Sequence, residues 1–238
     1  MRKTYIFIFA GGIFLALAFL FFIVGKSTEG QGAHLYRNSD ANISKINLTV
    51  FYTVPKDKMP YDFETVMASL EPALEEASAF HSLQFVDKSW IQYSIYPTVL
   101  KLERDSFFYD TEDTSRGNPN ALASITEEIK DNNLIVEKKG EFTVLGIIYE
   151  GLGAAGALSE DSKLGSFILS RDFITREEYV LSRSALLYHE FGHTLGIPDL
   201  YDLDTGEAFT SDIMGGGRQE PLEANYIEIS TLKEMGVL

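Results

Sequence analysis

Residues 189–199 read His189-Glu190-Phe191-Gly192-His193-Thr194-Leu195-Gly196-Ile197-Pro198-Asp199. Positions four apart lie on one face of an α-helix, so His189 and His193 can offer imidazole nitrogens to a single metal ion. Glu190 directly follows the first histidine and can reach a metal-activated water without occupying a coordination position. The competing interpretation is a solvated helix face that is rich in His and Glu, and the residues that follow decide between the two.

The residues after His193 predict a third ligand. Gly196 lies where a left-handed residue ends a helix, and Pro198 prevents the helix from resuming. The chain then turns back and brings Asp199 to the metal. Two neutral histidines, one carboxylate and an open fourth position are typical of catalytic zinc. If Asp199 only caps the turn, Asp202 or a later Glu has to be the third ligand.

The segment Ser211-Asp212-Ile213-Met214-Gly215 adds a family resemblance. It resembles the Met-turn of the metzincin clan of zinc peptidases, in which a methionine packs beneath the metal-binding histidines. Residues 189–202 also resemble the immune inhibitor A family of secreted metalloproteases, and Asp212-Ile213-Met214 loosely matches that family's Asp-Leu-Met turn. The close match covers about 50 residues at the C-terminal end.

The resemblance implies a zinc-dependent endopeptidase that acts on peptide or protein substrates. Glu190 is then the general base, His189, His193 and Asp199 hold Zn²⁺, and Met214 is a packing floor. Some metzincins place an oxyanion-stabilising tyrosine after the Met-turn, which makes Tyr226 a candidate; ordinary packing is its simpler interpretation.

Two rival classes remain. One is a membrane-anchored, inactive metzincin-fold binding module, which the intact ligands and base disfavour. The other is a gluzincin-type peptidase whose third ligand is a downstream glutamate such as Glu220, Glu223 or Glu228. That alternative leaves the Met-turn unexplained.

Composition narrows the remaining classes. The formal net charge of −15 disfavours a nucleic-acid partner, because little would neutralise phosphates. The chain has no cysteine, which excludes disulfides, thiol ligands and a lipoprotein anchor and favours an exported bacterial or archaeal protein. The oligomeric state is not determined by these features.

The N-terminus predicts export. Arg2 and Lys3 precede an uncharged run over residues 4–24 that is long enough to span a bilayer. We expect residues 1–25 to be a single-pass membrane anchor, with the catalytic domain outside the cell membrane; secretion after signal cleavage is the alternative. Residues 26–44 are rich in Gly, Ser and Asn and are expected to form a flexible tether before a catalytic domain at 45–238.

Hydrophobic periodicity predicts an α/β fold, with a twisted mixed sheet, a backing helix and an active-site helix. Residues 61–80 form the expected backing helix. A capping-box pattern at residues 175–178 predicts an active-site helix that runs from Thr175 to about Leu195. Strands are expected at residues 46–54, 83–86, 91–100, 142–149, 151–157 and 165–169, with 142–149 central and 151–157 at the edge beside the substrate.

The other candidate residues are weaker. Asp202, Asp204 and Glu207 surround Gly206 and could hold Ca²⁺, although an acidic solvated loop is the favoured interpretation. His34 and His81 have no partner in a ligand pattern and are interpreted as a tether histidine and a helix-end histidine.

Overall fold

A mixed, twisted sheet organises the protein in a computed structural model that describes residues 32–110, 117–202 and 205–238. Within these ranges six strands form one sheet, in the order β4-β3-β6-β8-β7, with β5 pairing β3. All neighbours are parallel except β7, which runs antiparallel to β8. The strands are β3 (Lys45–Val54), β4 (Trp90–Ile95), β5 (Leu100–Lys101), β6 (Phe142–Tyr149), β7 (Ala154–Leu158) and β8 (Leu164–Ser170). The predicted α/β mixed sheet is confirmed.

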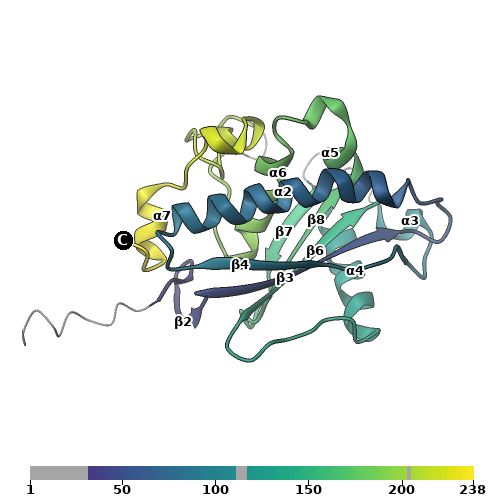
Figure 1. Ribbon diagram of the computed structural model, residues 1–238, viewed down its shortest axis with the longest axis horizontal. Coiled ribbons are helices and arrows are strands. Elements are labelled where there is room, and N and C mark those ends of the chain that lie inside the picture. Colours follow the sequence, from purple (N-terminus) through teal and green to yellow (C-terminus); the bar gives the residue numbers. More distant parts are fainter. Residues whose placement is uncertain (1–31, 111–116, 203–204) are drawn as a thin grey trace, which may run out of the picture. The chain divides into compact units, whose positions relative to one another are not determined.

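Helices cover both faces of this sheet (Figure 1). On one face lie α2 (Phe63–Gln84) and α6 (Arg183–Thr194); on the other lie α3 (Ser106–Tyr109) and α4 (Pro119–Asp131). Every residue of β6 is buried, and its side chains alternate between the two cores: Val144 and Ile148 face α2 and α6, whereas Leu145 and Ile147 face α4. This continuous apolar strand is central, as predicted, because both of its faces are covered.

The backing helix α2 is longer than predicted. Asp62 caps its start by accepting a hydrogen bond from the Thr65 N–H, and its buried residues recur every three or four positions. The helix continues through Pro72 to Gln84. The strand predicted at residues 83–86 is therefore wrong, because its first two residues form the last turn of α2.

The active-site helix begins later than predicted. The pattern at residues 175–178 does not start a helix: Thr175 ends α5 (Arg171–Thr175), and its hydroxyl bonds back to the Arg171 carbonyl. Ser170 is the cap of α5, and a short 3-10 turn, η1 (Glu177–Tyr179), separates α5 from α6. The helix that carries both histidines is α6, which starts at Arg183.

The tether prediction for residues 26–44 fails from Ala33 onward. Residues 33–238 form one compact unit, and Ala33, Leu35 and Ile43 are fully buried in its core. A small hairpin of β1 (His34–Leu35) and β2 (Asn38–Asn42) occupies this stretch, and the Tyr36 N–H bonds the Leu195 carbonyl beyond α6. The polar composition resembles a linker, but three apolar side chains are enough to hold the segment on the domain.

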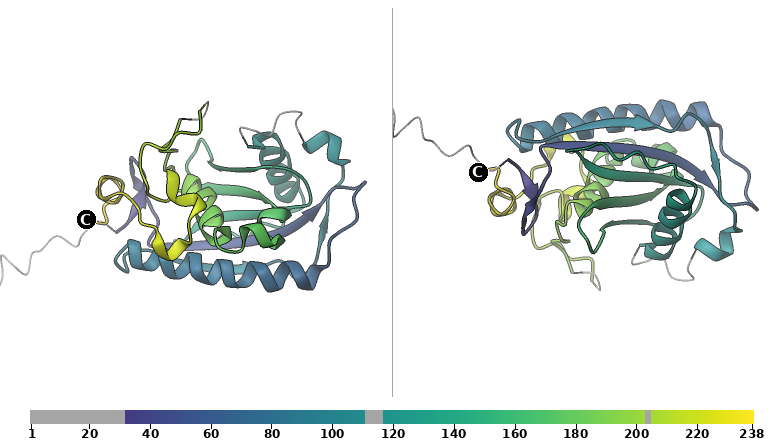
Figure 2. Two further views of the ribbon diagram at one scale, coloured as in Figure 1. Left: turned by 90° about the horizontal axis from the view of Figure 1, so that it is seen from above. Right: turned by 90° about the horizontal axis from the view of Figure 1, so that it is seen from below.

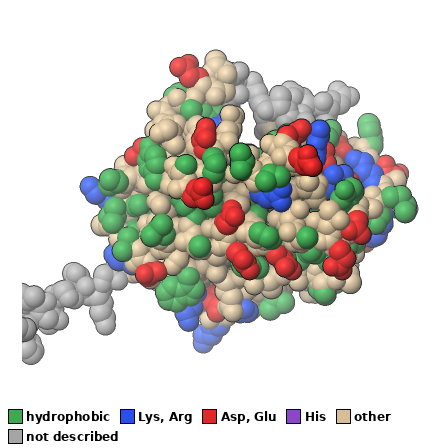
Figure 3. All heavy atoms as spheres, turned by 45° about the horizontal axis from the view of Figure 1, so that its top comes forward, with side chains coloured by type: hydrophobic (Ala, Val, Ile, Leu, Met, Phe, Trp, Pro, Cys, Tyr) green, Lys and Arg blue, Asp and Glu red, His purple; other side chains and the backbone are tan. Residues whose placement is uncertain are grey.

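The C-terminal part crosses the α6 side of the domain (Figure 2). It contains the 3-10 turns η2 (Gly216–Gln219) and η3 (Leu222–Ala224) and the helix α7 (Ile229–Glu234). Acidic side chains are spread over the face seen in Figure 3 and do not gather in one patch. No helix of the described ranges is both long and apolar enough for a membrane span, and the apolar run predicted at residues 4–24 lies outside those ranges.

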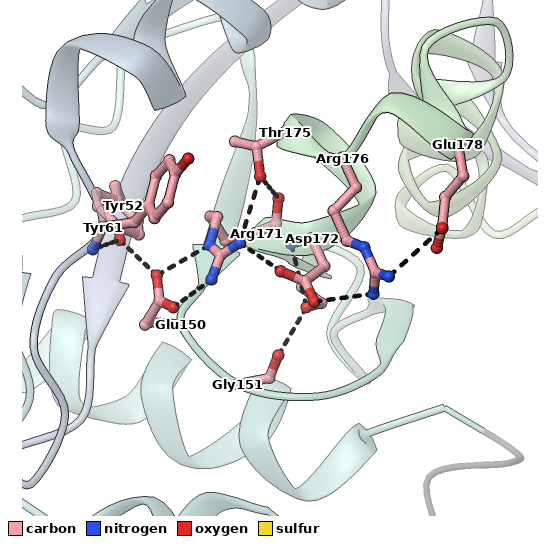
Figure 4. A network of polar contacts seen from close by, with 10 residues as sticks. Tyr52, Tyr61, Glu150, Gly151, Arg171, Asp172, Thr175, Arg176 and Glu178 are labelled. Atoms are coloured by element: carbon pink, nitrogen blue, oxygen red, sulfur yellow. Dashed lines mark hydrogen bonds and ion pairs between the residues drawn. The ribbon is translucent and has the colours of Figure 1, made fainter.

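A polar network joins the carboxyl ends of three neighbouring strands (Figure 4). Arg171 donates from Nη2 and Nε to the two carboxylate oxygens of Glu150, at 2.7 and 3.2 Å. The Tyr52 hydroxyl, at the end of β3, donates to the same carboxylate, and Asp172 pairs with both Arg171 and Arg176. This bidentate pairing fixes α5 against the sheet and so positions the chain that leads into α6.

His81 locks α2 against α6. It is completely buried, and its Nδ1 and Nε2 lie 2.9 and 2.8 Å from the hydroxyls of Tyr188 and Ser89. Tyr188 directly precedes His189, so the contact with His81 lies one residue from the first motif histidine. Burial lowers the pKa of His81 to about 3. His34, predicted in the tether, is also buried, and its Nδ1 lies 2.9 Å from the Leu35 carbonyl.

The depressed pKa of His81 predicts acid sensitivity. The unfolded chain binds a proton at His81 below about pH 6.5, whereas the folded protein does not until about pH 3. The free energy of unfolding should therefore fall as the pH drops below 6.5, by about 2 kcal/mol from this residue at pH 5. His81→Gln should remove that part of the slope in urea titrations at pH 7 and pH 5; parallel losses in both proteins would contradict it.

Candidate metal centre

Helix α6 presents the two motif histidines side by side. The rings of His189 and His193 lie 4.8 Å apart between centroids and nearly perpendicular, at 83°. The helix ends at Leu195, and Gly196 takes a φ of 81°. A side chain would strain that left-handed conformation, so glycine allows the reversal there. The Ile197 N–H then bonds back to the Gly192 carbonyl.

The reversal brings Asp199 to both histidines. Its Oδ1 lies 3.3 Å from Nε2 of His189 and 3.3 Å from Nε2 of His193. One donor atom from each of the three residues falls within 4.8 Å of the other two, and this is the one such group found in the described ranges. The structure therefore brings together the three residues that the sequence nominates as ligands.

Backbone carbonyls orient the two rings. Nδ1 of His189 lies 2.9 Å from the Ile213 carbonyl, and Nδ1 of His193 lies 2.8 Å from the Ile197 carbonyl. A carbonyl only accepts, so each Nδ1 carries a proton; in the neutral ring Nε2 is then the nitrogen left to bind a metal, and it faces Asp199. This is the tautomer that metal-binding histidines adopt when a second group fixes the ring.

The orphaned oxygen of Asp199 supports a metal in this position. Its Oδ1 is buried and has no hydrogen-bond partner of good geometry among the described residues, although both Nε2 atoms are close. Burial raises the pKa of Asp199, but the contacts with His189 and His193 outweigh it and hold the pKa well below the usual range. The two Nε2 atoms and one carboxylate oxygen thus converge on one point, and with both rings neutral this donor set fits Zn²⁺.

Glu190 lies beside the three converging residues in a largely buried position. Its side chain is 9% exposed. Burial raises the pKa of the Glu190 carboxyl, and the neighbouring charges of His189 and His193 oppose that rise. Burial thus keeps this carboxyl out of bulk water, next to the proposed ligands.

Met214 packs directly beneath the helix. It is fully buried, and a Cβ added to Gly192 would stand 2.6 Å from the Met214 sulfur. Only glycine at 192 lets the methionine approach so closely. Because Ile213 bonds His189, the same turn both supports the helix and orients one ring.

Tyr226 occupies a different environment from the one considered for an oxyanion stabiliser. Its hydroxyl lies 3.1 Å from the Ser211 hydroxyl and 3.4 Å from Glu228, and the residue is 39% exposed. The aromatic residue next to the histidines is instead Tyr201, whose ring centroid lies 6.0 Å from that of His189. The sequence signal for Tyr201 is its place two residues after Asp199.

Arg218 is the second residue that sequence reasoning missed. Its guanidinium carbon lies 3.7 Å from the centroid of the Tyr201 ring, a cation–π contact. Burial and the nearby Asp199 carboxylate raise the pKa of Tyr201 to about 12, and Arg218 opposes this. No motif spacing links Arg218 to the histidines; the turn after Met214 brings it there.

The calcium site around Gly206 stays a prediction. Asp204 lies outside the described residues. Asp202 accepts hydrogen bonds from the Thr205 N–H and hydroxyl within the turn, at 2.7 and 3.0 Å.

The geometry predicts that Asp199 contributes directly to metal affinity. Asp199→Ala should weaken zinc binding by about 100-fold or more, which exceeds the 10–100-fold typical of an outer-shell residue. Chelator competition measures the affinity. Tyr201→Phe, which keeps the ring beside His189, is the matched control and should lose less. Unchanged affinity in Asp199→Ala would remove this residue from the site.

Comparisons with known proteins give distant structural likenesses. No protein-family model matches the chain, and no curated protein matches it in sequence. Metalloproteinase-II from Bacteroides fragilis is similar with a TM-score of 0.46 and 12% identity, over 81% of this chain and 52% of that one. This chain thus spans about half the length of that protein. Archaemetzincin from Archaeoglobus fulgidus is similar with a TM-score of 0.32 and 10% identity, over 80% of this chain and 99% of that one. At these identities and TM-scores neither likeness indicates the function of this chain.

Proposed function

We propose that the protein is a zinc-dependent endopeptidase. The observation that carries the proposal is the convergence of the two Nε2 atoms and the buried Asp199 Oδ1, with the Glu190 carboxyl beside them. Three protein ligands leave a fourth zinc position open, as catalytic sites require and closed structural sites do not. The resemblance of residues 189–202 to the immune inhibitor A family agrees with this function.

Glu190 has the role of general base in this proposal. Zinc, when bound, supplies a Lewis acid and lowers the pKa of water to about 7. Glu190 takes the proton of the attacking water at its carboxylate and passes it to the leaving nitrogen. The low exposure of Glu190 favours this role, because burial raises the pKa of its carboxyl and so makes the carboxylate a stronger base. No enzyme nucleophile is required.

The free edge of the sheet offers a place for an extended substrate. β7 ends the sheet, and two backbone bonds fix its orientation: the Ser159 N–H donates to the Leu164 carbonyl, and the Ser170 N–H donates to the Gly153 carbonyl. Such pairs recur at every second residue of an antiparallel ladder. The odd-numbered residues of β7 therefore bond to β8, and the even-numbered residues direct their N–H and C=O groups outward.

The outward groups lie next to the metal ligands. A Cβ on Gly156 would stand 2.2 Å from the Glu190 carbonyl oxygen and 2.8 Å from the His193 Cβ, so the β7 backbone passes directly against α6 at this residue. The Ala154 carbonyl is already bonded by the Asn118 N–H, which leaves the outward groups of Gly156 and Leu158 for a substrate strand.

The orientation of β7 decides which backbone substitutions can test this proposal. Proline at Ala155 or Ala157 removes an N–H that pairs with β8, so it would damage the sheet and not the substrate contact. The backbone of the substrate is therefore the better place to remove a donor.

The inactive binding module remains the alternative function, and catalytic turnover separates the two. We also propose that the N-terminal apolar run anchors the protein in the cell membrane with the domain outside. Cell fractionation, with protease treatment of intact cells, distinguishes an anchored protein from a secreted one.

Glu190→Gln should abolish peptide hydrolysis and leave zinc binding nearly unchanged. A general base typically contributes about 10²–10⁴-fold to the rate, and the variant keeps the size of the side chain. Turnover of an unfolded protein, measured with zinc and with a chelator, tests this. Near-normal turnover in the zinc-loaded variant would refute the role of Glu190.

The paired edge predicts an alternating response to backbone methylation of a substrate. N-methyl groups placed one residue at a time along a cleaved peptide should slow hydrolysis at every second position near the scissile bond, where the N–H faces β7. Positions between them should tolerate methylation. Uniform sensitivity or uniform tolerance along the peptide would argue against strand addition at β7.

A further inference from the structure

A hollow opens on the sheet face opposite α6, between α4 and the β7–β8 hairpin. Its volume is about 490 Å³. The walls that matter come from α4 (Leu122, Ala123 and Thr126) and from the hairpin (Ala157, Leu164 and Ser166). Figure 1 shows α4 on the side of the sheet away from α6.

Small residues leave this space open at the end of the hydrophobic core that lies between the sheet and α4. Ala155 and its partner Ile168 pack into the core beneath α4, and Ile168 is fully buried. Two residues further along β7 the next pair on this face is Ala157 and Ser166, which remain partly or fully accessible. The hydrophobic core beneath α4 therefore ends at Ala157 and Ser166, where the side chains are small, and the hollow begins there beside the edge of the sheet.

One polar group in the wall lacks a partner. Thr126 is 8% exposed, and its hydroxyl has no hydrogen-bond partner in the described ranges. Buried hydroxyl groups are normally bonded, so this one marks a wall that is incomplete without an occupant.

A strand added to β7 would place side chains into this hollow. The pleat continues across a sheet, so the residue opposite Gly156 faces α6 and the proposed zinc ligands, and the next residue, opposite Ala157, faces α4. Ala157 bonds to β8, so its pair with the added strand is the non-hydrogen-bonded type, with Cβ atoms about 4.5 to 5.5 Å apart. A side chain at that place enters the hollow directly.

We propose that this hollow is a side-chain subsite of the peptide groove that selects an apolar residue in the substrate. The proposal rests on the proposed endopeptidase function and on strand addition at β7. Leu122, Ala123, Ala157 and Leu164 give the hollow an apolar lining. Its rim carries both signs of charge, from Glu127, Lys130 and Asp131, so no single charge is favoured. A side chain of leucine or phenylalanine size fills the space that alanine leaves empty.

The test compares matched peptides on the full, zinc-loaded chain. Each position of a cleaved peptide is varied in turn between alanine and leucine, and kcat/KM is measured. Leucine should be favoured by about 10-fold or more at the position that faces the hollow, the size of effect that hydrophobic pockets produce. That position should adjoin one whose side chain faces the metal.

Ala123→Phe fills the hollow from α4, where residue 123 is exposed. It should lower kcat/KM for the leucine peptide to the value for the alanine peptide, so that the ratio of the two falls to about one. Ser124→Phe is the matched control, because Ser124 lines a separate hollow with Arg104 and Phe108. It should preserve the preference.

Equal loss for both peptides in Ala123→Phe, or no leucine preference at any position in the wild type, would overturn the subsite. Absence of hydrolysis for every peptide would instead overturn the endopeptidase function. In that case anisotropy binding of the same labelled peptides to Glu190→Gln decides on the hollow. Tighter binding of the leucine peptide, lost when Ala123→Phe is added to Glu190→Gln, supports the subsite. Equal binding of both peptides to Glu190→Gln overturns the subsite.

Discussion

The approach of Asp199 to the two histidines is the constraint on which the site depends. Residues four apart on α6 face one point by helix geometry alone, but a carboxylate from beyond the helix reaches that point only if the chain reverses within a few residues. Gly196 makes the reversal possible by adopting a φ of 81°. The same turn supplies the Ile197 carbonyl that holds the His193 ring. One backbone conformation thus both positions Asp199, the proposed third ligand, and orients the ring of His193.

Close approach of other segments to α6 completes the arrangement. Gly192 lets Met214 pack under the helix, and Gly156 lets β7 pass over it against the Glu190 backbone. From the opposite side, His81 bonds Tyr188 and so ties the helix to α2. The helix that carries both histidines is therefore held by the sheet edge, the turn at Met214 and the backing helix. These contacts fix the directions of the proposed ligands, which would reduce the ordering cost of metal binding.

The features of the fold and site that could be predicted from the sequence are those that depend on the spacing of residues close together in the chain. The helix spacing of His189 and His193 and the apolar run of β6 translate directly into geometry. Reasoning from local patterns failed where tertiary contacts override composition. The polar stretch from Ala33 to Ile43 joins the core through three apolar residues. The pattern at Thr175 does not cap a helix, because Ser170 already caps α5 and Thr175 is the last residue of that helix. Tyr201 and Arg218 meet beside the histidines through the loops after α6, and hydrophobic periodicity does not predict the course of loops. The outward direction of the Gly156 backbone groups follows only from the register of β7 and β8.

Anomalous X-ray scattering at the zinc edge, from crystals of the zinc-loaded protein, tests the central claim most directly. The account predicts one strong peak about 2.0 to 2.2 Å from Nε2 of His189, Nε2 of His193 and a carboxylate oxygen of Asp199, with the fourth position open toward Glu190. A peak that uses a different carboxylate as its third ligand would contradict the account, as would a fully active protein with no metal at these residues.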